Sequence, residues 1–206
     1  MHGTFFDIGL GAGLAVSCGL RPFLPLLLAG TLARAGDLGL SFSSSSLHFL
    51  QSTAWLLVVT LALVASYVVQ ITTGRPATEE RLFTGGDPFA ATLSGLALGA
   101  GALVFAGTLA AHGDAWWPGI VAGLACALAG ERAAGPLVAR AWRRLPDRGA
   151  RGALTLYLDA ASLIAAAAVC ALHVLGYVLL ALALWWLIRS RGRGEQSYAG
   201  LRVLRR

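Results

Sequence analysis

The residue with the clearest potential for chemistry is Arg21, which lies inside an apolar segment. An arginine in the middle of a membrane-spanning helix costs about 2.5–3.5 kcal/mol on insertion scales, so it normally faces protein or water. Pro22 and Pro25 follow, and because proline lacks a backbone donor, they predict a kink or break in this helix. A guanidinium beside a break could bind a phosphate or carboxylate through forked hydrogen bonds. A structural ion pair, or snorkelling to the interface, is the alternative.

Asp159 is the natural partner of Arg21. It lies beside Tyr157 near the start of the last apolar stretch, where an unpaired carboxylate would be costly or protonated. We therefore expect either an ion pair with Arg21 or a proton-carrying role; the alternative is a carboxylate solvated near the lipid headgroups. The hypothetical ligand-binding site consists of Arg21, Asp159, Pro22 and Pro25.

The other polar groups favour no catalytic chemistry. His173 is interpreted as a turn residue, and the adjacent Glu131 and Arg132 as a surface pair. The polar residues Asp37, His48, His112 and Asp114 have no metal-ligand spacing. The chain contains no phosphate-binding loop and no HExxH, CxxC, GxSxG or dinucleotide motif. We expect neither an enzyme nor a bound cofactor or metal.

The composition predicts an integral membrane protein. Of the 206 residues, 57% are hydrophobic and 13% are charged, whereas roughly 25% are charged in a soluble domain. All 16 basic residues are arginine, and lysine and asparagine are absent, which points to a GC-rich bacterial genome. Most of the net charge of +6 lies in two blocks beside apolar segments, a pattern of membrane topology rather than of nucleic-acid binding.

Four apolar segments are long enough to span a bilayer, which takes about 20 residues. The first is 8–33, broken at Arg21-Pro22. The second is about 47–71, where the run Ser43 to Ser46 could supply an N-cap. The third is 88–111. The fourth begins at the aromatic pair Trp116-Trp117 and continues past residue 129 as an amphipathic extension that carries Arg132, Arg140, Arg143 and Arg144.

The last apolar stretch, 153–188, is too long for one pass. Wholly helical, it would extend about 54 Å at 1.5 Å per residue, and the hydrocarbon core is about 30 Å thick. Arginine-rich segments flank it on both sides. If both flanks are cytoplasmic, the stretch enters and returns. We predict a helical hairpin broken at residues 173–176, with one long tilted helix as the alternative.

The predicted architecture is an all-α transmembrane bundle of four spans plus this C-terminal hairpin. With segment 140–151 in the cytoplasm, loop 112–116 is outside, loop 72–87 inside, loop 34–46 outside and the N-terminus inside. Both termini are then cytoplasmic, in a multi-pass protein of a bacterial inner membrane or plasma membrane.

Residues 1–190 form the predicted transmembrane domain, and 191–206 form a basic cytoplasmic tail. We expect the arginine-rich segments to rest against anionic lipid headgroups.

Small residues recur at spacings that let helices approach closely, at Gly9-x-x-x-Gly13, Gly95-x-x-x-Gly99 and Gly119-x-x-x-Gly123. They indicate a compact bundle, and either internal packing or dimerisation would use them. A nine-residue segment, 29–37, also recurs as 106–114 with an offset of 77, which leaves open a parallel internal repeat or coincidence.

The segment from Gly9 to Leu27, with its glycine-rich run and the step Leu20-Arg21-Pro22-Phe23-Leu24-Pro25, resembles the opening of the domain-of-unknown-function 4126 family of bacterial membrane proteins. The resemblance implies a small polytopic membrane protein and, at Asp159, a family acidic position. Many members carry an acidic residue late in the second segment, where this chain has Ser66-Tyr67. The family implies a fold and a location but no activity.

The function we expect is that of a small transporter or lipid-handling protein. Its ligand would be an anionic lipid headgroup or a small organic anion, held near Arg21 and Asp159. The competing class is a non-transporting structural or assembly subunit of a membrane complex, in which Arg21 and Asp159 form a structural pair. A homo-oligomer is compatible with either class.

Overall fold

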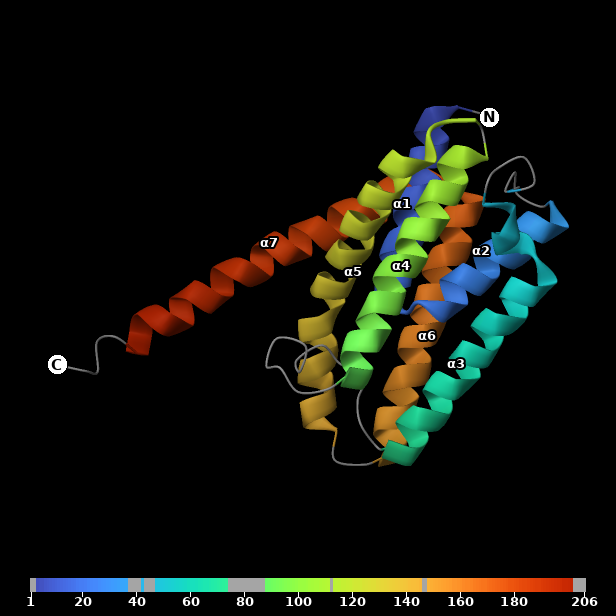
Figure 1. Ribbon diagram of the computed structural model, residues 1–206. Helices are drawn as coiled ribbons and strands as arrows, with labels where there is room; N and C mark the ends of the chain where they lie inside the picture. The colour runs from blue at the N-terminus through green and yellow to red at the C-terminus, as the bar shows by residue number, and fades with distance from the viewer. Residues whose placement is uncertain are drawn as a thin grey trace.

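The computed structural model describes residues 3–36, 42, 47–73, 88–111, 113–145 and 148–201. Within these residues the chain is all α-helical, as predicted, and contains no strand (Figure 1). The elements are α1 (Thr4–Leu20), α2 (Phe23–Ala35), the 3-10 helix η2 (His48–Gln51), α3 (Thr53–Thr73), α4 (Pro88–Ala110), α5 (Trp116–Arg144), α6 (Arg148–Ala171) and α7 (Leu175–Leu201).

Helix α1 lies at the centre of the bundle and packs against α4, α5, α6 and α7. Every residue from 9 to 19 is buried. Its glycines make this possible, because small residues let helix backbones approach closely. A Cβ added to Gly13 would lie 2.6 Å from Cα of Gly176 and 2.7 Å from Cγ1 of Val169. The crossing of α1 and α7 therefore requires glycine at this position.

Two of the three predicted small-residue spacings pack within the chain. Gly9 and Gly13 face α7, and Gly119 and Gly123 face α4, where a Cβ at Gly119 would lie 2.7 Å from Cα of Ala106. The spacing at Gly95 and Gly99 differs, because a Cβ there would meet no described atom within 4 Å.

The first apolar segment is broken at Arg21-Pro22, as predicted, but it is not a single kinked span. Helix α1 ends at Leu20, and α2 then runs back toward the end of the bundle at which α1 began (Figure 1). The contacts agree with this reversal. A Cβ at Gly11 would touch Thr108 near the end of α4, whereas one at Gly19 would touch Ala127, less than halfway along α5. The tip of the α1–α2 pair thus lies inside the bundle.

The second arm returns to the level of the α4 C-terminus. A Cβ at Gly30 would lie 2.8 Å from the carbonyl oxygen of Leu50, and Leu50 in turn lies beside Gly107 of α4. Arg34 donates a hydrogen bond from Nη1 to the hydroxyl of Thr53, where α3 begins. The segment 8–33 therefore enters and leaves the bundle at one end.

This reversal changes where the start of α1 lies relative to the connection between α4 and α5. The counting scheme placed the N-terminus and loop 112–116 on opposite sides, whereas the structure places them at the same end (Figure 1). At that end, the ring of Phe6 lies 6.3 Å from the ring of His173, and the hydroxyl of Tyr177 donates a 2.6 Å hydrogen bond to the carbonyl oxygen of Phe5. The predicted topology counted 8–33 as one crossing, whereas α1 and α2 enter and leave the bundle at one end.

Three helices are long and apolar enough to cross a membrane in the described part of the chain: α4, α5 and α6. Helix α4 matches the third predicted segment, and α5 runs continuously through its predicted amphipathic extension. Helix α3 begins later than predicted, at Thr53. Its N-cap is Ser52, whose hydroxyl oxygen accepts a 3.2 Å hydrogen bond from the backbone N–H of Trp55. The run Ser43 to Ser46 lies outside the described residues.

The last apolar stretch breaks at residues 172–174, which includes His173 as the turn residue, so one long helix is excluded. The two arms do not form a packed hairpin of short helices. Helix α6 begins at Arg148, and α7 diverges from it to pack against α1 and α5 (Figure 1). Helix α7 also continues without a break past the predicted boundary at residue 191, as far as Leu201.

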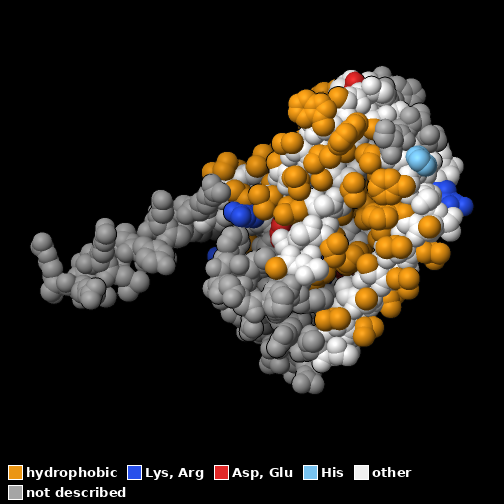
Figure 2. Space-filling view, in the orientation of Figure 1, with side chains coloured by type: hydrophobic (Ala, Val, Ile, Leu, Met, Phe, Trp, Pro, Cys, Tyr) orange, Lys and Arg blue, Asp and Glu red, His pale blue; other side chains and the backbone are white. Residues whose placement is uncertain are grey.

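The outer flanks of the bundle are apolar, and charged side chains are sparse on the face in view (Figure 2). Helix α3 shows this most clearly, with large hydrophobic side chains that are more than half exposed: Leu57, Val58, Leu61, Val64 and Val68. An apolar surface of this extent suits lipid.

The two similar nine-residue segments, 29–37 and 106–114, each include the C-terminus of a helix, and both of these C-termini lie at the same end of the bundle. Gly36, which caps α2, has φ 72°, and Gly113, after α4, has φ 85°. These left-handed conformations favour glycine. The likeness therefore contains a shared helix-ending signal, while Asp37 and His112 lie outside the described residues.

Candidate functional site

The break between α1 and α2 places Arg21 at the tip of a helix pair. Its backbone is extended, with φ −151° and ψ 118°, and its N–H donates a 3.1 Å hydrogen bond to the carbonyl oxygen of Ser17. Pro22 has no N–H with which to continue the helix, so α1 ends here. The sequence thus determines that α1 ends at Arg21, and the direction of α2 is set by its contacts.

The two prolines also start the next helix. Pro22 is the N-cap of α2, and Pro25 is its third residue. The first four N–H groups of a helix have no partner within that helix, so the missing donor of Pro25 costs nothing at this position. Both prolines are buried. Their role is to shape the tip, and neither offers a polar side-chain atom to a ligand.

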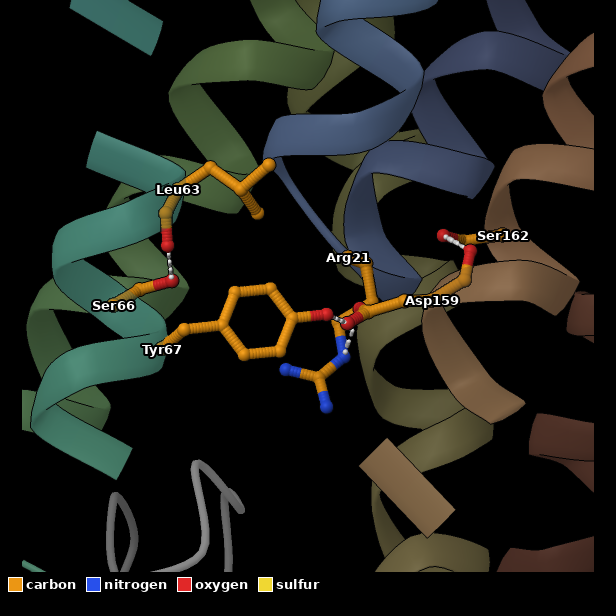
Figure 3. A network of polar contacts seen from close by, with 6 residues as sticks. All are labelled: Arg21, Leu63, Ser66, Tyr67, Asp159 and Ser162. Atoms are coloured by element: carbon orange, nitrogen blue, oxygen red, sulfur yellow. Dashed lines mark hydrogen bonds and ion pairs between the residues drawn. The ribbon is translucent and has the colours of Figure 1, made fainter. Parts of the chain in front are cut away.

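Arg21 and Asp159 form an ion pair. Arg21 Nε lies 3.0 Å from Asp159 Oδ1 (Figure 3). Asp159 lies halfway along α6 and is 5% exposed, so the alternative of a carboxylate solvated near the headgroups is wrong. Both charges lie away from the ends of the bundle. At this depth, either charge would be costly without the other.

Tyr67 completes the cluster from a third helix. Its hydroxyl donates a hydrogen bond to Asp159 Oδ2, so the two carboxylate oxygens have different partners (Figure 3). Neighbouring hydroxyls stay within their own helices: Ser66 donates to the carbonyl oxygen of Leu63, and Ser162 to that of Asp159. Sequence reasoning missed Tyr67 as a site residue, although Ser66-Tyr67 stands where many family members carry an acid.

The cluster leaves part of the guanidinium open. The Arg21 side chain is 17% exposed, against 7% for that of Asp159. Neither Nη nitrogen has a hydrogen-bond or ion-pair partner among the residues that the structure describes, and both point away from Asp159 (Figure 3). A guanidinium held by Nε in this way still has four N–H donors with which to bind an anion.

Glu131 corrects another prediction. It is 8% exposed and therefore not part of a surface pair, although the neighbouring Arg132 is exposed. Its Oε2 has no hydrogen-bond partner in the described part of the chain. The last turn of α1 packs directly on it, since a Cβ at Gly19 would lie 3.0 Å from its backbone nitrogen. The sequence signal that could have indicated a buried Glu131 is its position next to Gly130 in an apolar helix.

The part of the chain that contributes two of the three cluster residues is also the part that is similar to a known family. Residues 8–77 match the family described as Domain of unknown function (DUF4126). The resemblance of the opening segment is thereby confirmed over α1, α2, η2 and α3. No curated protein and no solved structure matches the chain.

The DUF4126 match separates the cluster into two parts. Arg21 and Tyr67 lie within the matched residues, whereas Asp159 lies in α6, beyond them. The matched segment therefore supplies the reversing helix pair and the phenol, and the later part of the chain supplies the carboxylate.

Proposed function

We propose that this protein binds an anionic group at Arg21 and acts as a small transporter or lipid-handling protein of a bacterial inner or plasma membrane. The ligand is a lipid headgroup or a small organic anion; both present the phosphate or carboxylate that a guanidinium recognises. The observation that carries the proposal is the partly exposed guanidinium of Arg21. Its Nε is paired with Asp159, and neither Nη nitrogen has a hydrogen-bond or ion-pair partner among the described residues.

The tip of the α1–α2 pair supports this proposal. Backbone that breaks a helix inside a membrane protein is tolerated where it is buried in protein or lines a water-filled cavity, and such breaks often accompany substrate sites. Here the break carries the arginine, and Asp159 orients it. Tyr67 holds the second oxygen of the carboxylate, which leaves Asp159 less free to compete with a ligand for the Nη donors.

The second candidate is a structural or assembly subunit. The observation that favours it is that both oxygens of Asp159 have partners, so the cluster ties the α1–α2 tip, α3 and α6 together without a ligand. In this function the apolar flanks pack against partner subunits, and the ion pair serves stability alone.

Native mass spectrometry on protein purified in mild detergent separates the two functions. The informative variant replaces the pair by apolar residues, Arg21→Met with Asp159→Leu, because an apolar substitute for a buried ion pair often preserves stability. An anion site predicts that a bound lipid or metabolite is retained by the wild-type protein and lost from this folded double variant.

The matched control is Arg34→Met, which removes an exposed arginine at the other end of α2. It should retain the bound anion. If wild type, control and double variant carry the same ligands, the anion-binding function is wrong and the structural subunit becomes the better description.

A further inference from the structure

A second basic site lies between α5 and α7. A small pocket is lined by Pro136, Leu137 and Arg140 of α5 and by Trp186, Arg189 and Ser190 of α7. Among the described residues that line it, two are arginines and none is acidic. None of its residues belongs to the Arg21–Asp159 cluster.

We propose that this pocket binds the phosphate of an anionic phospholipid, with the acyl chains along the apolar surfaces of α5 and α7. The two guanidinium groups are opposite in charge to the phosphate and can each donate forked hydrogen bonds to it, and basic pockets between membrane helices are recognised sites for anionic lipids. Both arginines are exposed, so the headgroup can reach them without a change in the bundle.

The depth of the pocket supports a lipid rather than a soluble anion. Along α5, Arg140 is followed by Arg143 and Arg144, and on α7 Arg189 directly follows an apolar run that ends at Ile188. The two arginines therefore sit where hydrocarbon gives way to headgroups. Leu137 and Trp186 provide the apolar wall that a free phosphate would not need.

One of the arginines is already oriented by its neighbours. The guanidinium carbon of Arg189 lies 5.3 Å from the ring centroid of Trp185. Such a cation–π contact holds the side chain in place while its N–H groups stay free to bind phosphate. Trp185 is 52% exposed, as expected for an aromatic residue at a lipid interface.

An exposed apolar side chain continues from the pocket along α7. Leu182 lies about one helical turn before Trp186, on the same face of the helix, and is 54% exposed. An acyl chain that extends from a phosphate at Arg140 and Arg189 would cover it. Phosphate and hydrocarbon thus each meet a matching surface.

The test is native mass spectrometry of the full chain titrated with phosphatidylglycerol or with phosphatidylcholine of the same acyl chains. The wild-type protein should bind phosphatidylglycerol preferentially. The double variant Arg140→Gln with Arg189→Gln should lose about thirtyfold in affinity for phosphatidylglycerol and each single variant about fivefold, with little change for phosphatidylcholine.

The matched control is Arg34→Gln with Arg144→Gln, which removes two exposed arginines that do not line the pocket. Equal binding of the two lipids by wild type, or an equal loss in the control, would overturn the proposal. Competition by glycerol phosphate as strong as by the lipid would also overturn it, since a headgroup alone would then suffice. The double variant Arg21→Met with Asp159→Leu should keep this site, which separates it from the proposed function.

Discussion

Tyr67 of α3 donates its hydroxyl hydrogen to Asp159 of α6, 92 residues further along the chain. The same carboxylate is paired with Arg21 at the tip of the α1–α2 reversal. A single acidic side chain thus joins three segments that are distant in sequence. Two of the three residues lie in the DUF4126 segment and one outside it, so the cluster depends on how the two parts of the chain pack.

Removing the phenol hydroxyl should weaken the bundle without disturbing its helices. Tyr67→Phe leaves one buried carboxylate oxygen without its partner, which costs about 1–3 kcal/mol. We expect a lower unfolding free energy in detergent, followed by denaturant titration. Tyr157→Phe is the matched control, because Tyr157 lies in α6 and is 71% exposed. Equal effects of the two substitutions would show that the Tyr67 hydrogen bond contributes nothing.

The Arg21–Asp159 pair should show strong energetic coupling. Removing one partner of a buried pair leaves the other charge uncompensated, which costs about 3–5 kcal/mol, whereas replacing both with apolar residues is often close to neutral. The double variant Arg21→Met with Asp159→Leu should therefore lose less stability than the sum of the two single variants. Arg34→Met should be additive with Asp159→Leu. Additivity in both cycles would contradict the ion pair.

Glu131 should respond in the opposite direction from Asp159. One of its buried carboxylate oxygens has no hydrogen-bond partner among the described residues, and such a group costs about 1–3 kcal/mol. We expect Glu131→Leu to raise the thermal unfolding midpoint in detergent, while Asp159→Leu lowers it. A lower midpoint for Glu131→Leu would show that this carboxylate has a stabilising partner.

Glycine substitutions should separate packed from open helix faces. In Gly13→Ala the new methyl group would lie 2.6 Å from Cα of Gly176, and overpacking of this kind costs about 1–3 kcal/mol. Gly95→Ala meets nothing within 4 Å among the described atoms and should gain about 1 kcal/mol from helix propensity. Denaturant titration of both variants measures the difference, and destabilisation by Gly95→Ala would indicate a partner surface there.

The reversal of α1 and α2 predicts where the N-terminus lies. Single cysteines at Gly3 and Gly149 should react with a membrane-impermeant maleimide from opposite sides of sealed vesicles. The native cysteines Cys18, Cys126 and Cys170 are buried, so the background is low. By the positive-inside rule Gly149, among the arginines, should be cytoplasmic. Labelling of both positions from one side would mean that residues 8–33 cross the membrane.

Several helix boundaries could be predicted from local chemistry. Proline removes a donor wherever it occurs, so the break at Arg21-Pro22 needed no tertiary information. The run 88–111 matches α4 within one residue, because hydrophobic length alone specifies a membrane helix. The break before Leu175 was placed within a few residues, since a single helix of that length would not fit the bilayer.

The directions and partners of these helices could not be predicted in the same way. A proline pair gives the same local signal for a kink as for a reversal, and the return of α2 depends on its contacts with η2 and α3 at Gly30 and Arg34. The divergence of α7 from α6 depends likewise on Gly176, which packs on α1. Contacts of this kind join residues that are far apart in the chain.

The sequence by itself determined an all-α chain with apolar helices, a break beside an intramembrane arginine and an acid in the last apolar stretch. The length of an apolar segment and the position of a proline act locally, so the helices and breaks that they cause can be predicted from the local sequence. Only the tertiary structure decided that Arg21 meets Asp159, that Tyr67 holds the second oxygen, and that Glu131 is buried. A buried polar group takes its partner from whichever helix packs beside it, and that choice depends on the fit of all the helices together.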